Sequence, residues 1–185
     1  MRWTVVLFAA AVLLGLDQAV RHHLAIGHTV IAPSFTLPLV VFIALFAPPL
    51  GALWTALLIG VVIDLASPRG AGAITVAGPY ALGYLVAAYF VLTVRALMYR
   101  RNPLTLMVLS IIACAMAEVI IVSILKIRTI YSDAYVFSGF SQLAQRLLGA
   151  LYTGVAALVM SFVLFAMMPI FGFHDPRERR FGARK

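Results

Sequence analysis

Two acidic residues lie inside long apolar stretches of the sequence. Asp64 stands near the end of one stretch and Glu118 in the second half of another. A carboxylate at the centre of a membrane costs about 3 kcal/mol unless it has a partner. Arg146, at the start of the last apolar stretch, could form an ion pair with either acid, and Arg69 follows Asp64 closely. An ion pair would fix the helix register, whereas the functional alternative is a proton or cation relay or a site for a polar ligand.

The segment after Asp64 contains residues that permit a sharp turn. Gly70, Gly72 and the pair Gly78-Pro79 allow the chain to reverse and enter the membrane again, because glycine adopts positive φ angles. Asp64 could accept hydrogen bonds from free N–H groups of this turn. The turn could equally form an interaction surface, since both interpretations use the same geometry.

Enzyme and metal signatures are absent from the sequence. His22, His23 and His28 have only Asp17 nearby, and no H-E-x-x-H or C-x-x-C pattern is present. There is no G-x-S-x-G elbow, P-loop or dinucleotide fingerprint. The single cysteine, Cys114, cannot form an internal disulfide. We therefore expect no catalytic residue, no metal and no cofactor.

The composition is that of an integral membrane protein. Of the 185 residues, 64% are hydrophobic and 11% charged, against roughly 45–50% and 25% in soluble domains. The net charge of +8 fits topology and anionic lipid headgroups better than nucleic acid. Arg2 and the apolar run after it resemble a signal peptide, but no small-x-small cleavage site follows, so we expect an uncleaved helix.

Apolar runs predict an all-α bundle of about six transmembrane helices, with residues 1–172 as one domain and 173–185 as a basic cytoplasmic tail. Pro33 and Pro38 could kink the second span, and a short re-entrant helix is the alternative for that segment. Residues 131–145, rich in aromatic and small polar side chains, suit a helix in the outer interface. The expected spans are 3–16 (extending to 20 if Asp17 and Gln18 reach the interface), 29–47, 50–66, 71–98, 104–125 and 146–168.

Basic residues orient the expected bundle by the positive-inside rule. An inner N-terminus leaves Arg21, Arg69, Lys126, Arg128 and Arg146 outside. This places the C-terminus in the cytoplasm, but five spans with an outer N-terminus score equally. The larger set falls inside: Arg2, Arg95, Arg100, Arg101, Arg177, Arg179, Arg180, Arg184 and Lys185.

Small residues recur at the spacing that lets helices approach closely. We expect them to pack helices within the bundle, with a partner interface as the alternative. The pairs are Ala11 with Gly15, Gly83 with Ala87, and Ala150 with Gly154.

From residue 33 to residue 101 the order of these features resembles the MreD family of bacterial rod shape-determining membrane proteins. One departure is Ser34-Phe35-Thr36, where family members often have a polar or acidic residue just after the proline. The matching features are Pro33, Phe42-Ile43-Ala44-Leu45, Pro49-Leu50-Gly51, Gly60-Val61-Val62-Ile63-Asp64-Leu65, Gly70-Ala71-Gly72, Gly83-Tyr84-Leu85, Arg95 and Arg100-Arg101.

The resemblance implies a non-enzymatic subunit of the cell-elongation complex in the bacterial inner membrane. Its partner would be MreC, with MreB filaments and peptidoglycan synthases reached indirectly, and both a monomer and a homodimer are left open. The alternative is a substrate-binding membrane subunit of an energy-coupling-factor vitamin transporter. Trp54, Tyr80 and Tyr84 could line its pocket, and Ala11 and Gly15 could contact a second subunit.

Overall fold

The computed structural model describes residues 2–24, 32–66, 78–98, 102–131 and 139–173. No strand occurs among these residues, so the predicted all-α class is confirmed for this part of the chain. The helices are α1 (Trp3–Leu24), α2 (Thr36–Phe46), α3 (Pro49–Ala66), α4 (Pro79–Val94), α5 (Pro103–Tyr131) and α6 (Gly139–Ala166).

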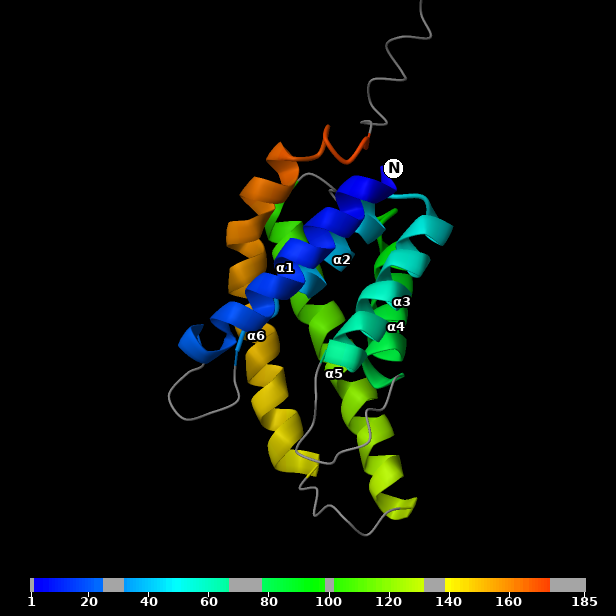
Figure 1. Ribbon diagram of the computed structural model, residues 1–185, viewed down its shortest axis with the longest axis vertical. Helices are drawn as coiled ribbons and strands as arrows, with labels where there is room; N and C mark the ends of the chain where they lie inside the picture. The colour runs from blue at the N-terminus through cyan, green and yellow to red at the C-terminus, as the bar shows by residue number, and fades with distance from the viewer. Residues whose placement is uncertain (1, 25–31, 67–77, 99–101, 132–138, 174–185) are drawn as a thin grey trace, which may run out of the picture.

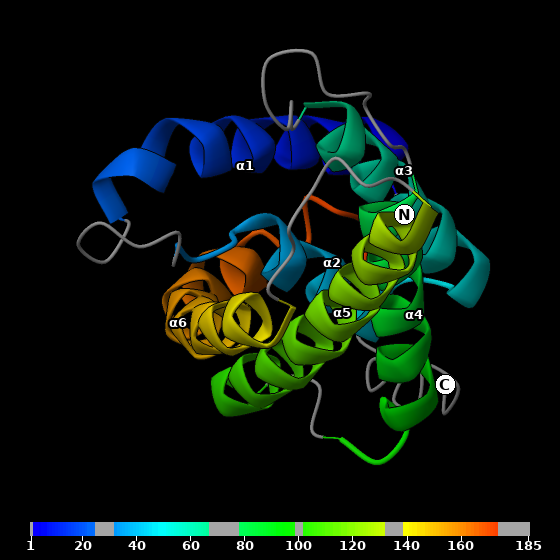
Figure 2. The same ribbon diagram turned by 90° about the horizontal axis from the view of Figure 1, so that it is seen from below.

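The helices surround a short central one (Figures 1 and 2). Helix α5 packs along α6 on one side and α4 on the other, and α3 packs along α4. Helix α2 contacts all five of the others, and α1 runs across it. Every residue of α2 from Thr36 to Leu45 is buried. The core of the protein is therefore built around α2.

Within the part of the chain that the structure describes, three helices contain segments that are long and apolar enough to cross a membrane: Pro49–Ala66, Pro103–Ile127 and Leu143–Ala166. At 1.5 Å per residue, about 20 helical residues cover the hydrocarbon core of roughly 30 Å. The apolar parts of the other helices are shorter, namely Trp3–Ala19, Thr36–Phe46 and Pro79–Val94. The fold is thus compatible with a membrane.

The expected span over 29–47 is shorter in the structure, where α2 begins only at Thr36. Neither proline kinks the helix, for two reasons. Pro33 precedes the helix, and Pro38 lies in the first turn, where the N–H that proline lacks has no partner within the helix anyway. An 11-residue helix covers about 16 Å, half of the hydrocarbon core.

Other helix boundaries also differ from the expected ones. Helix α1 continues beyond the expected end at residue 16 or 20, and α5 beyond residue 125. Within the expected span 71–98, α4 begins only at Pro79, after Gly78, whose φ of 139° matches the expected positive angle. Of the segment 131–145, which was expected to form an interfacial helix, residue 131 ends α5 and residues 139–145 begin α6, while residues 132–138 lie outside the described ones.

Both ends of the described chain lie at the same end of the bundle (Figure 1). The backbone N–H of Arg2 donates to the carbonyl of Phe171 at 3.0 Å. After α6 the chain folds back over α2, and the rings of Phe171 and Phe173 pack on Phe42, with centroids 5.7 and 5.9 Å away. The start of α1 and the end of α6 are thereby held together.

Two of the three small-residue pairs pack inside the bundle. A Cβ on Gly83 would lie 3.1 Å from the carbonyl oxygen of Ala117 on α5, and Ala87 beside it is buried. A Cβ on Gly154 would overlap Ile111 of α5, and Ala150 is buried as well.

The third pair does not pack against the rest of the described chain. Ala11 and Gly15 are exposed on α1, and a Cβ on Gly15 would meet nothing within 4 Å. The expected internal packing is wrong for this pair, because α1 turns this face away from α2.

Candidate functional site

Asp64 holds the beginning of α4. It is 2% exposed, and its carboxylate accepts hydrogen bonds from the backbone N–H groups of Gly78, Tyr80 and Ala81 at 2.9, 3.2 and 3.1 Å. These N–H groups have no partner within the helix, and the positive end of the helix dipole favours a carboxylate there. The structure thus joins Asp64 to the return turn, and no Asp64–Arg146 pair forms.

Gly60 lies one helical turn before Asp64 and lets α3 approach α4. A Cβ at this position would lie 2.5 Å from Cα of Ala81 and 2.7 Å from the carbonyl oxygen of Tyr80, which is too close for any side chain. The sequence gives one signal for this role, because Gly60 and Asp64 share one helix face by their four-residue spacing, but it does not show which helix lies against that face.

A second carboxylate, Asp17 of α1, holds the beginning of α2. It accepts hydrogen bonds from the backbone N–H groups of Phe35 and Thr36 at 2.6 and 3.2 Å, and from the Thr36 hydroxyl at 2.8 Å. The Tyr84 hydroxyl lies 3.2 Å from that of Thr36 and 3.5 Å from that of Ser34. The sequence places Asp17 at the end of the first expected span but does not reveal that it binds residues 35 and 36.

Arg95 binds the opposite end of α2. Its Nη1 donates to the carbonyl oxygens of Ala44 and Ala47 at 3.1 and 2.8 Å. These are carbonyls that the end of a helix leaves without a partner, and a cation there complements the helix dipole. Helix α2 is therefore held by an acid at its beginning and a base at its end.

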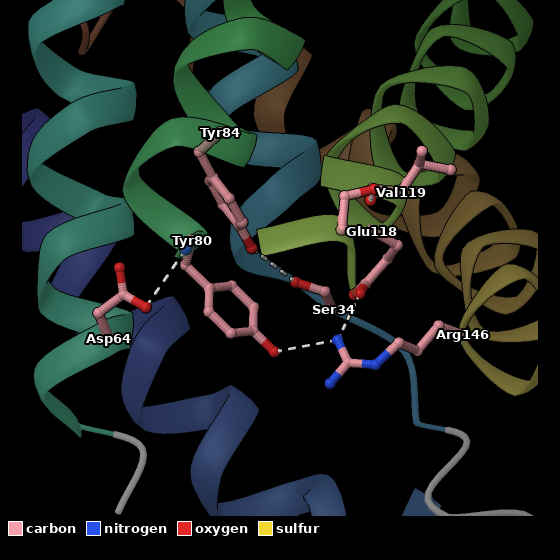
Figure 3. A network of polar contacts seen from close by, with 8 residues as sticks. Ser34, Asp64, Tyr80, Tyr84, Glu118, Val119 and Arg146 are labelled. Carbon is pink, nitrogen blue, oxygen red and sulfur yellow. Dashed lines mark hydrogen bonds and ion pairs between the residues drawn. The ribbon is translucent and has the colours of Figure 1, made fainter. Parts of the chain in front are cut away.

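Glu118 of α5 and Arg146 of α6 form an ion pair at 2.5 Å (Figure 3). The same Nη1 of Arg146 lies 3.5 Å from the hydroxyl of Tyr80 on α4. The side chains of Arg146 and Glu118 are 25% and 19% exposed. The structure thus contains the second of the two pairings considered from the sequence.

These groups line a cavity of about 310 Å³. It lies between the later part of α1, the beginnings of α2 and α4, the second half of α5 and the first half of α6. The cavity therefore lies toward the later part of α1 and the first half of α6, away from the helix ends that the Arg2–Phe171 hydrogen bond joins. Its polar lining consists of Asp17, Gln18, Ser34, Thr36, Tyr80, Tyr84, Cys114, Glu118, Gln145, Arg146 and Thr153.

Some sequence-based candidates lie elsewhere. Trp54 is 52% exposed and does not line the cavity, whereas the two tyrosines grouped with it do. Arg69, Gly70, Gly72 and the histidine side chains lie outside the described residues. Within the described residues, no group of three or more histidine, cysteine or acidic side chains could hold a metal ion.

Comparison with known families gives a match over almost the whole chain. The family of the rod shape-determining protein MreD matches residues 1–171. This chain belongs to the MreD family. No curated protein and no solved structure matched it.

The family match includes all six helices, whereas the features noted in the sequence covered only residues 33–101. MreD proteins are membrane proteins of rod-shape determination, and the apolar helices of this chain fit that location. MreD is a structural component of the shape complex and is not known as an enzyme. The cavity and the ion pair are the features from which a more specific role can be argued.

Proposed function

We propose that this MreD-family chain binds MreC and has no catalytic activity of its own. In this proposal a segment of MreC at the outer membrane surface enters the cavity between α1, α2, α4, α5 and α6. The complex thereby couples cytoplasmic MreB filaments to peptidoglycan synthesis outside. The single observation that carries the proposal is the cavity itself, a polar hollow in an otherwise apolar bundle.

The orientation of the bundle supports this assignment. Arg2 and Arg95 lie at the end opposite the cavity, and the chain continues after Phe173 from that end into the basic tail. By the positive-inside rule this end faces the cytoplasm, so the cavity opens outward. The neighbouring ends of α1 and α6 also favour an even number of crossings. Helix α2 begins beside Asp17 on the cavity side and ends beside Arg95 on the other, so its segment counts as one of six crossings although the helix itself is short.

The polar groups of the cavity suit binding better than turnover. The carboxylate of Asp17 accepts a hydrogen bond from the backbone just before α2, and that of Glu118 forms an ion pair with Arg146. No nucleophile–base pair is formed by the side chains that line the cavity in the described residues. A site that converts substrate would need such a pair or a metal.

Photo-cross-linking tests the proposal in membranes that contain both proteins. A benzophenone amino acid in place of Gln145, which lines the cavity, should cross-link to MreC. The same amino acid in place of Phe162, which is 66% exposed on α6 and does not line the cavity, is the matched control. An intact complex that gives no cross-link from position 145 would contradict the cavity assignment, and the absence of any complex would contradict MreC binding.

The vitamin-transporter alternative retains one supporting observation. The cavity volume of about 310 Å³ lies at the lower end of small-molecule sites, which are about 300–1,000 Å³. Mass spectrometry of the purified protein tests this alternative. A stoichiometric vitamin lost on Tyr84→Phe would support the transporter and overturn the proposal above.

A further inference from the structure

The ion pair between Glu118 and Arg146 uses only part of the hydrogen-bonding capacity of each side chain. Nη1 of Arg146 contacts both Oε2 of Glu118 and the hydroxyl of Tyr80. In the described part of the chain, Nη2 and Nε of Arg146 have no acceptor, and Oε1 of Glu118 has no donor. A guanidinium offers five N–H donors and a carboxylate two acceptor oxygens, so both groups keep free positions.

These free positions border the cavity. Both side chains line it, and neither is fully buried. In Figure 3 the guanidinium points toward Tyr80, with its second terminal nitrogen directed away from Glu118. The two helices that carry the pair are tightly packed, because Gly154 of α6 brings it against Ile111 of α5. The pair is therefore held in place before any occupant arrives.

We infer that Glu118 and Arg146 together recognise a main-chain peptide group of the segment that occupies the cavity. Arg146 donates from Nη2 or Nε to a carbonyl oxygen, and Oε1 of Glu118 accepts from an N–H. This inference rests on the proposed binding of MreC and names the chemical group that the cavity selects.

The charge of the pair argues for a neutral occupant. A carboxylate brought to Arg146 would also meet Glu118, and a cation brought to Glu118 would also meet Arg146. A peptide group carries a donor and an acceptor but no charge, so it gains both hydrogen bonds without repulsion. Hydrogen bonds to charged groups are stronger than those between neutral groups, which makes an ion pair an effective binder of amides.

Arg146→Lys tests the inference, with binding to full-length MreC measured in lipid nanodiscs. Lysine keeps the charge and its pairing with Glu118 but loses the planar fork of donors. We expect the affinity to fall about 10- to 100-fold while the melting temperature stays near that of the wild type. Arg95→Lys, a matched change at the other end of the bundle, should leave the affinity unchanged. Equal affinities of wild type and Arg146→Lys would overturn the inference, whereas a wild type that does not bind MreC would overturn the proposed function instead.

A second measurement uses the unchanged MreD-family chain, so it remains informative if the lysine variant does not fold. It asks whether the ion pair recognises a main-chain group or a charged side chain of MreC. Each charged residue of the MreC segment cross-linked from position 145 is neutralised in turn. Recognition of the main chain predicts little change in affinity for every one of these variants. A single acidic or basic residue whose neutralisation weakens binding by about tenfold or more would show that the pair recognises a charged side chain, and would overturn the inference.

Discussion

Replacement of Asp64 should separate the acceptor role of this side chain from its charge. Leucine removes the acceptor and leaves three backbone N–H groups at the beginning of α4 without a partner. Each buried unsatisfied group costs about 1–3 kcal/mol, so the free energy of unfolding should fall by about 3–6 kcal/mol after partial relaxation. Asparagine keeps one acceptor oxygen, which can serve Gly78 and Ala81, and should cost about 1–2 kcal/mol.

Reversible unfolding in mixed lipid–detergent micelles measures these differences. Leu65→Ala is the matched control, because Leu65 adjoins Asp64 but is 62% exposed on the outer side of α3. It should change the free energy of unfolding little. Equal losses for Asp64→Asn and Asp64→Leu would show that charge decides, and a fully stable Asp64→Leu would refute the capping argument altogether.

Three further predictions concern the rest of the bundle. Gly60→Ala should lower the free energy of unfolding by about 1–3 kcal/mol, because its Cβ would overlap the backbone at Ala81. Gly15→Ala is the control for the same unfolding assay, and it should have little effect because nothing lies within 4 Å of a Cβ at that position. Arg95→Ala should cost about 1–3 kcal/mol through the freed carbonyls at the end of α2, and a melting temperature equal to that of the wild type would contradict this. A cysteine at Arg184 should resist an impermeant thiol reagent added outside intact cells, with little background since the native cysteine is buried; labelling from outside would reverse the proposed orientation.

The sequence predicted the long helices well because their apolar character alone determines them. The runs that contain Asp64, Glu118 and the start of α6 exceed what a soluble core helix needs, and each is helical. The partner of Arg146 could be narrowed to two acids, since only Asp64 and Glu118 lay in recognised spans.

Contacts between helices could not be predicted in the same way. Apolar periodicity does not reveal that α2 begins at Thr36, because the residues before it are also apolar and the helix is buried on all sides. The role of Asp17 depends on an inter-helix contact to Thr36, 19 residues away. The binding of Arg95 to Ala44 spans 51 residues. Such contacts follow from the three-dimensional packing, which one sequence does not specify locally.

The position of α2 has a consequence for how the protein is made. The acid that holds its beginning, Asp17, leaves the ribosome before α2, but the arginine that holds its end is 51 residues later than Ala44. Of the five helices that contact α2, four (α3 to α6) emerge after it. We expect arrested nascent chains that end after α3 to be degraded faster by membrane proteases than chains that include α6, and equal lifetimes would argue against this order. Synthesis must therefore proceed past the first half of the protein before both ends of α2 have their partners. Until then, the insertion machinery has to keep the unpacked α2 away from proteases and from other chains.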